Sequence, residues 1–148
     1  MTGEVFVDTN VLVYARDASE PIKQRRAALW VEHLWATRSG RTGVQVLNEY
    51  YVTVTRKLQP GMPRLQARAD VQALRAWNPV AVDPDLMERA FTLEDVASLS
   101  WWDALIVAAA HGSMSRYILS EDLPTGQLID GIRIISPFDT EPVDLEEP

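Results

Sequence analysis

Four acidic residues stand where local structure would bring them to one edge of a folded domain: Asp8, Glu49, Asp103 and Asp122. Asp8 and Asp122 each fall just after an apolar run that has the character of a short buried strand. In open α/β sheets, ligand sites lie beyond the carboxyl ends of the strands, so these two carboxylates are expected at the same edge. Carboxylates gathered at one edge repel each other, and divalent cations relieve that repulsion. The four acids together therefore predict a cation-binding site.

Two of these acids also have a simpler structural explanation at the start of a helix. Asp8, Thr9 or Asn10 can cap the helix expected to follow them, with no ligand involved. Ser100 followed three residues later by Asp103 matches a helix-capping arrangement. Asp103 also precedes residues 104–110, a stretch with almost no polar face, so its helical turn must lie against the core. Capping and metal binding are compatible roles for Asp103.

The other two acids are equally ambiguous when taken alone. Glu49 lies within an expected helix, where an exposed helix-forming role is the commoner one, although apolar neighbours leave it only a narrow polar face. Asp122 can be a plain turn residue, and Ser120 or Glu121 can serve in its place. The prediction therefore depends on the set and its order along the chain, and on no single residue.

The absence of cysteine narrows the possible chemistry. It excludes disulfide frameworks, zinc–thiolate sites and cysteine nucleophiles. His33 and His111 are the only imidazole donors, and both fall at polar or helix-end positions where a surface role is expected. Ligands that are all oxygen atoms favour Mg²⁺ or Mn²⁺ over zinc.

Size and charge bound the kind of protein. The chain has 148 residues, which fits one domain with one core. The net charge of −7 is unusual for a protein that contacts phosphates. Residues 137–148 contain five acidic residues and no basic one, so the rest of the chain carries −2. We expect a single domain over residues 1–136 and an acidic, mobile tail over 137–148.

Apolar periodicity and turn residues predict alternating short strands and helices. The strands are expected at residues 4–8, 80–82, 117–119 and 132–135, and the helices at 11–15, 21–39, 45–58, 64–77, 84–99 and 100–112. This alternation is typical of an α/β fold with a small central parallel sheet wrapped by helices. Ala27, Trp30, Val31, Leu34 and Trp35 recur at helical spacing and are expected to face the core, with one Trp ring free to line a groove for a partner helix.

Four segments in order resemble the PIN-domain family, and within it the VapC toxins of bacterial toxin–antitoxin pairs. The segments are residues 5–12 (VFVDTNVL), 48–50 (NEY), 102–110 (WDALIVAAA) and 119–123 (LSEDL). Each motif is weak by itself, but the four in sequence are specific, and the resemblance extends over residues 5–135. This chain departs from the family in two ways: the N-terminal motif begins a few residues later, and the acidic tail is an addition.

The resemblance implies a Mg²⁺- or Mn²⁺-dependent endoribonuclease with a PIN-like fold. It places the family's acidic positions at Asp8, Glu49, Asp103 and Asp122, and Thr9, Asn10 and Ser120 are expected to support them. We expect Asp8 and Asp103 to bind the main cation, with Glu49 and Asp122 completing its shell directly or through water. The resemblance further implies an RNA substrate, a homodimer and a cognate VapB-type antitoxin that covers the site.

Competing interpretations fit less well. A phosphatase of the haloacid dehalogenase type would need a second Asp where this chain has Asn10, and a receiver domain would need an acid pair after its first strand. A PIN domain that binds RNA or a protein without cutting is the main alternative, although all four acids are present. Arg16, Arg41 and Arg116 are weaker candidates for phosphate contacts, with a solvated surface role expected for each.

The sequence contains no apolar run near the roughly 20 residues that a membrane-spanning helix requires. Glu4 and Asp8 also interrupt the N-terminal region where a secretory signal would need a basic start and an unbroken apolar block. We therefore expect a cytoplasmic protein with no membrane contact.

Overall fold

A computed structural model describes residues 4–145 of the chain. Residues 1–3 and 146–148, which belong to the expected domain and tail, lie outside the described residues. Three helical turns in the described residues are not α-helical: a π-helical turn, η1 (Thr53–Lys57), and two 3₁₀ turns, η2 (Leu74–Trp77) and η3 (Pro142–Leu145). The α-helices are α1 (Thr9–Tyr14), α2 (Pro21–Thr37), α3 (Val44–Val52), α4 (Arg64–Ala73), α5 (Pro84–Val96) and α6 (Trp101–Gly112).

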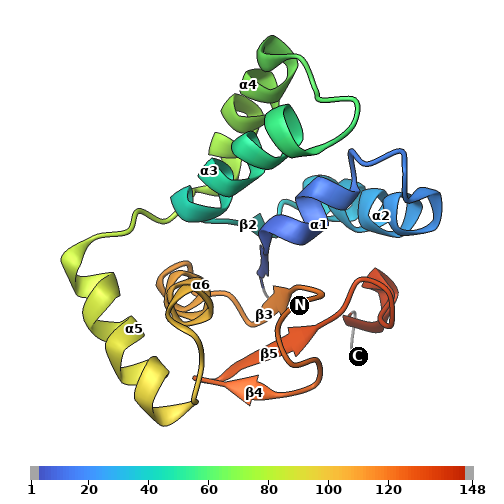
Figure 1. Cartoon of the computed structure of the whole chain (residues 1–148). Helices are drawn as coiled ribbons and strands as arrows, with labels where there is room; N and C mark the ends of the chain where they lie inside the picture. Colours follow the sequence, from blue (N-terminus) through green and yellow to red (C-terminus); the bar gives the residue numbers. More distant parts are fainter. Residues whose placement is uncertain (1–3, 146–148) are drawn as a thin grey trace.

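The sheet has five strands in the order β2-β1-β3-β5-β4. Its strands are β1 (Val5–Val7), β2 (Gly40–Arg41), β3 (Tyr117–Leu119), β4 (Leu128–Ile129) and β5 (Ile132–Ile135). All neighbouring pairs are parallel except β4 and β5, which form an antiparallel edge. Figure 1 shows α1 and α2 on one side of the strands and α5 and α6 on the other, with α3 and α4 extending away from the sheet. The expected α/β fold is confirmed.

The core explains why β1 and α6 can both be almost wholly apolar. All three residues of β1 are buried, as expected for a strand covered on both faces. Residues 104–110 of α6 are also all buried, so this helix has apolar contacts on every side. β3 lies between β1 and β5 in the middle of the sheet, and the ends of these central strands set the position of the side chains that follow them.

The expected elements are largely present, with a few local differences. Residues 80–82 do not form a strand; Val80 makes only an isolated parallel bridge to Gly43. The strands β2 and β4 were not expected, since two residues carry too little pattern to show alternation. The expected long helix over residues 45–58 changes to π-helical hydrogen bonding at Thr53, and the helix over 64–77 tightens to 3₁₀ at Leu74.

The described part of the tail packs against the domain. Trp30 donates its indole N–H to the carbonyl of Thr140 at 3.0 Å, and Arg26 donates to the carbonyl of Pro137 at 3.1 Å. The rings of Phe138 and Tyr14 pack edge to face, with centroids 5.5 Å apart. We expected a mobile tail because residues 137–148 are poor in apolar side chains. In the structure, polar groups of α2 hold the described part of the tail, residues 137–145. The domain boundary at residue 136 remains a prediction.

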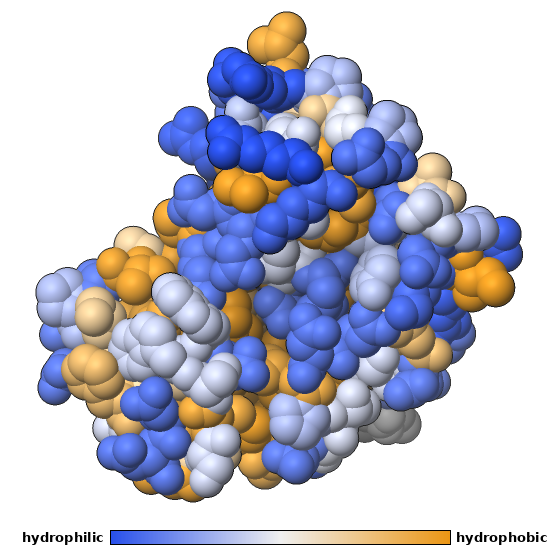
Figure 2. Space-filling model, viewed as in Figure 1, coloured by the Kyte–Doolittle hydropathy of each residue, from blue (hydrophilic) through white to orange (hydrophobic). Residues whose placement is uncertain are grey.

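The surface in Figure 2 is mixed, with hydrophilic residues over most of the face and apolar ones scattered between them. Among the described residues, no helix is both long and apolar enough to cross a membrane.

Candidate active site

Asp8 sits at the carboxyl end of β1, where sheet pairing continues one residue beyond the strand. Its backbone N–H donates to the carbonyl of Leu119 at 3.0 Å, which aligns Asp8 with the end of β3. Its Oδ1 accepts from the backbone N–H of Thr9 at 2.8 Å, so Asp8 is the N-cap of α1. The capping interpretation is therefore correct, and it leaves Oδ2 facing the end of the neighbouring strand.

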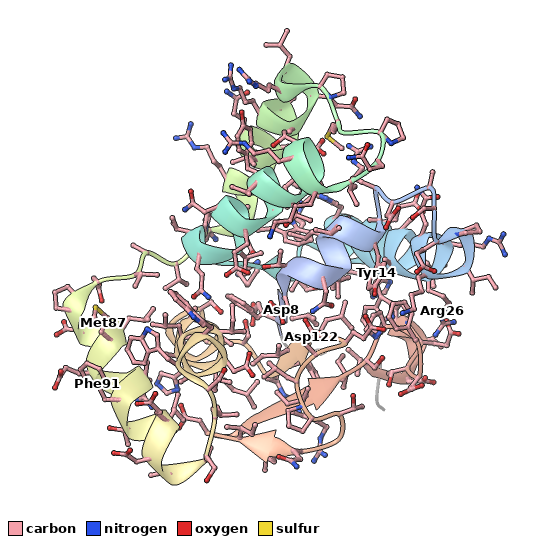
Figure 3. The ribbon with its side chains drawn as sticks, viewed as in Figure 1. Asp8, Tyr14, Arg26, Met87, Phe91 and Asp122 are labelled. Carbon is pink, nitrogen blue, oxygen red and sulfur yellow. The ribbon has the colours of Figure 1, made fainter. Side chains whose placement is uncertain are left out.

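Ser120 and Asn10 connect Asp8 to Asp122. The fully buried hydroxyl of Ser120 donates to Asp8 Oδ2 at 2.8 Å and accepts the backbone N–H of Asp122 at 3.1 Å. The side-chain amide of Asn10 donates to Asp8 Oδ2 at 3.3 Å and to Asp122 Oδ2 at 3.2 Å. In Figure 3, Asp8 and Asp122 lie near each other between α1 and the strands. Two carboxylates from opposite ends of the chain thus share one set of donors.

Glu49 reaches the same region from the exposed side of α3. Thr9 donates its hydroxyl to Glu49 Oε2 at 3.4 Å, and Gln45 donates its side-chain amide to Glu49 Oε1 at 3.0 Å. Since Thr9 also donates its backbone N–H to Asp8, Thr9 stands between the two acids. Gln45 escaped the sequence prediction, although its place four residues before Glu49 puts both on one helical face.

The electrostatics of Asp8 show that the acids act on each other. The pKa of Asp8 is raised to about 6: burial is the largest cause, hydrogen bonds from Ser120 and Thr9 oppose the rise, and the negative charges of Asp122 and Glu49 add to it. Within residues 4–145, Asp8, Glu49 and Asp122 form no ion pair with Lys or Arg. A cation would therefore be the favourable counter-charge here.

Asp103 is the acid that the structure does not connect to the others. It lies half-buried in the first turn of α6, and its backbone N–H donates to the hydroxyl of Ser100 at 3.2 Å, as the capping arrangement predicts. Within the described residues, its carboxylate makes no hydrogen bond or ion pair to Asp8, Glu49 or Asp122. Because α6 leads into β3 through a short turn, its N-terminus is directed toward the edge where β3 ends.

The chemistry of the donor set suits a hard divalent cation, since it offers only carboxylate, amide and hydroxyl oxygens. Gln45 Oε1, on the side chain that donates to Glu49, is a buried acceptor without a donor in the part of the chain that the structure describes. Among residues 4–145, no three His, Cys, Asp or Glu side chains already surround one point at coordination distance. The side chains of Thr9, Asn10 and Ser120 stand between the acids instead.

A second polar network supports the loop that carries Ser120 and Asp122. Glu121 accepts from Lys23 at 2.7 Å and from the Tyr14 hydroxyl at 2.6 Å, and its backbone N–H donates to Asn10 Oδ1 at 3.0 Å. Burial alone would raise the pKa of Glu121, but the hydrogen bonds from Lys23 and Tyr14 outweigh burial and lower it. Sequence reasoning missed this network because about 100 residues separate its partners.

The three arginines named as phosphate candidates differ in availability. Arg16 is committed to Asp70 through two hydrogen bonds of 3.0 and 2.6 Å, and Asp70 also accepts the Tyr50 hydroxyl. Arg41 donates to the carbonyl of Gly40 and lies 3.6 Å from Glu4. Arg116 is exposed beside the ring of its neighbour Tyr117. Arg16 and Arg41 therefore have structural roles.

The expected core stripe of α2 is buried except at its end. Trp30, Ala27 and Leu34 are at most 1% exposed, whereas Trp35 is 38% exposed and packs at a tilt against Trp77. Trp35 and Tyr50 line an apolar pocket of about 360 Å³ between α1, α2 and α4.

Comparison with known proteins supports the fold. Solved structures with similar folds include a toxin–antitoxin complex from Klebsiella pneumoniae, with a TM-score of 0.63 and 18% identity over 93% of this chain and 100% of that one. The structure of FitAB bound to an IR36 DNA fragment has a TM-score of 0.66 and 16% identity over 93% and 97% of the two chains. The sarcin–ricin loop cleaving toxin VapC20 of Mycobacterium tuberculosis has a TM-score of 0.56 and 20% identity over 78% and 87%.

A search of curated protein sequences finds no significant match. The sequence pattern of the PIN domain, in contrast, matches residues 5–123. This range begins at β1, ends just after Asp122, and includes every residue of the site described above. The chain therefore belongs to the PIN domain family.

Proposed function

We propose that this protein is a divalent-metal-dependent endoribonuclease whose active site comprises Asp8, Glu49, Asp103 and Asp122. The observation that carries the proposal is the buried Asp8 carboxylate, with its pKa raised by burial and by two neighbouring acids. Holding several acids together without a basic partner is costly for a fold. A cation-dependent reaction gives a reason for keeping them.

The residues divide into ligands and supports. Asp8 and Asp103 would bind the main cation, with Glu49 and Asp122 completing the shell directly or through water. Ser120 and Asn10 orient Asp8 and Asp122, and Thr9 orients Asp8 and Glu49. Both Glu49 and Asp122 are exposed, so their side chains are free to change rotamer when a cation enters. Mg²⁺ or Mn²⁺ held by these carboxylates would supply Lewis-acid activation of a water near neutral pH and would offset negative charge on the phosphate.

The test is cleavage of mixed-sequence RNA by the purified protein. Activity should require Mg²⁺ or Mn²⁺ and disappear with chelator. Asp8→Asn and Asp103→Asn should each reduce the rate by a factor of at least about 100. Asp95→Asn, an exposed acid on α5, is the matched control and should cut at the parental rate. Parental activity in the Asp8→Asn protein would refute the assignment.

We further propose that the nuclease acts as the toxin of a VapBC-type pair, as a homodimer bound by a VapB-type antitoxin. The support is the resemblance of the four motifs and the similarity of the fold to toxins solved in toxin–antitoxin assemblies. The gene immediately upstream provides the test. A short reading frame encoding a DNA-binding N-terminus should lie there, and its product should co-purify with this chain and inhibit cleavage.

The second candidate is a PIN domain that binds RNA or protein without cutting. The observation in its favour is that Asp103 makes no contact with the other acids and that no ready-made cation cage exists among the described residues. Metal titration separates the two functions. A binding module should retain RNA with and without Mg²⁺ and leave its length unchanged.

A further inference from the structure

Five of the basic side chains that form no ion pair among the described residues lie in one part of this acidic chain. Residues 53–78, which run from η1 through α4 to η2, contain Arg56, Lys57, Arg64, Arg68 and Arg75 and a single acid, Asp70. The segment therefore carries +4 in a chain whose net charge is −7. All five basic side chains are exposed, and none forms an ion pair within residues 4–145. Residues 21–41 also carry +4, but Lys23, Arg26 and Arg41 there pair with Glu121, Glu141 and Glu4.

The helix geometry places three of these charges on one face. Arg64, Arg68 and Arg75 are separated by four and seven residues, a spacing that keeps side chains along one stripe of a helix. Asp70 lies on the opposite side, where it accepts hydrogen bonds from Arg16 and Tyr50. The acid is therefore neutralised internally, and the outer face of α4 stays basic. Figure 2 shows strongly hydrophilic residues over α4, in the same view that contains Asp8 and Asp122 in Figure 3.

A pocket of about 350 Å³ adjoins this basic stripe between α3 and α4. Its polar lining is Asn48, Tyr51, Arg68 and Gln72, and Arg68 donates to the Tyr51 hydroxyl at 3.3 Å. An aromatic ring can stack on a nucleobase, side-chain amides can bond to its edge, and a guanidinium can bind the adjacent phosphate. The combination suits one unstacked nucleotide better than a peptide or a duplex.

We propose that the Arg64–Arg68–Arg75 stripe and the Asn48–Tyr51–Gln72 pocket bind single-stranded RNA that flanks the bond to be cut. The proposal rests on the proposed nuclease function and adds where its substrate lies. Asn48 immediately precedes Glu49 on α3, so the pocket and a proposed ligand of the acidic site belong to adjacent faces of one helix. The unpaired positive charge of this segment, in a protein of net charge −7, favours an anionic ligand such as the RNA backbone.

The test measures binding without cleavage, so that it does not depend on nuclease activity. The Asp8→Asn protein in chelator is titrated with fluorescent mixed-sequence single-stranded RNA at several salt concentrations. Arg64→Gln/Arg68→Gln/Arg75→Gln should weaken binding at least about tenfold and reduce the slope of log Kd against log salt by about 2. Arg25→Gln/Arg38→Gln/Arg133→Gln removes the same charge elsewhere and should leave affinity within about threefold.

The pocket is tested separately with Tyr51. Tyr51→Leu should weaken binding about tenfold without changing the salt slope, whereas Tyr51→Phe keeps the ring and should bind nearly as well as the parent. The proposal would be overturned by an equal loss of affinity in the two triple-arginine variants, or by no loss in the Arg64/Arg68/Arg75 variant. It would also be overturned if the Asp8→Asn protein bound no RNA. Equal affinity for duplex DNA would also overturn it. RNA binding that follows these variants, in a protein that never cleaves, would refute the nuclease function and leave the surface assigned.

Discussion

Ser120 donates its hydroxyl to Asp8 Oδ2 at 2.8 Å, across 112 residues of sequence. Ser120 Oγ also accepts the backbone N–H groups of Asp122 and Leu123, at 3.1 and 3.3 Å. One buried hydroxyl therefore orients two proposed ligands and stabilises the turn that follows β3.

Ser120→Ala should destabilise the protein by about 1 to 3 kcal/mol, because it removes a donor from a buried carboxylate and an acceptor from two N–H groups. Cleavage should fall with it. Urea unfolding and single-turnover cleavage measure the two effects. Ser113→Ala, at the far end of α6, is the control and should change both little. Normal activity in Ser120→Ala would show that this bond does not orient the site.

The metal-free protein should become less stable as the pH rises from about 4 to 6. Over this window Asp8, with a pKa of about 6 when folded against 3.8 for an ordinary Asp, binds more protons in the folded than in the unfolded state. The free energy of unfolding then falls with pH, by up to about 3 kcal/mol from this group. Urea unfolding in chelator at pH 4 and 7 measures the loss. Asp8→Asn should lose less over the same interval, and parallel curves for the two proteins would contradict the prediction.

Lys23→Met should lower the rate of cleavage several-fold with little change in stability. Lys23 and Tyr14 restrain Glu121, which lies beside Asp122 in the same loop. An ion pair that solvent screens contributes little to the free energy of folding. Steady-state kinetics should show the loss in kcat more than in KM. Arg89→Met is the control: it breaks a comparable ion pair, from Arg89 of α5 to Asp130 at 2.9 Å, that involves none of the site residues. A similar kinetic loss in that variant would remove the case for Lys23.

Gly40→Ala should destabilise the fold by about 1 to 3 kcal/mol. A Cβ at Gly40 would lie 2.5 Å from Cε2 of Trp77, and that ring is buried and has little room to move. Thermal unfolding measures the change. Gly112→Ala, whose new Cβ would lie 3.4 Å from Val80, should be tolerated. Equal melting temperatures for the two variants would show that the sheet edge at β2 adapts to the added methyl.

The sequence predicted those features that depend on local pattern. Short apolar runs located β1, β3 and β5, and period-3.6 spacing located most helices. The position of Asp8 just after its strand placed it at the sheet edge. Features that depend on distant partners were not predictable in this way. The link from Thr9 to Glu49 crosses 40 residues, and the link from Lys23 to Glu121 crosses 98. Two-residue strands such as β2 depend wholly on the neighbour that pairs with them.

The contact between Phe138 and Tyr14 has a practical consequence for protein production. Tyr14 also donates to Glu121, so the C-terminal segment contacts a residue that supports the loop carrying Ser120 and Asp122. Truncation of the chain at residue 136 would remove this contact and the carbonyl groups that accept hydrogen bonds from Trp30 and Arg26. A shortened fragment intended for enzymology should therefore retain the segment as far as Leu145, which is itself only 9% exposed.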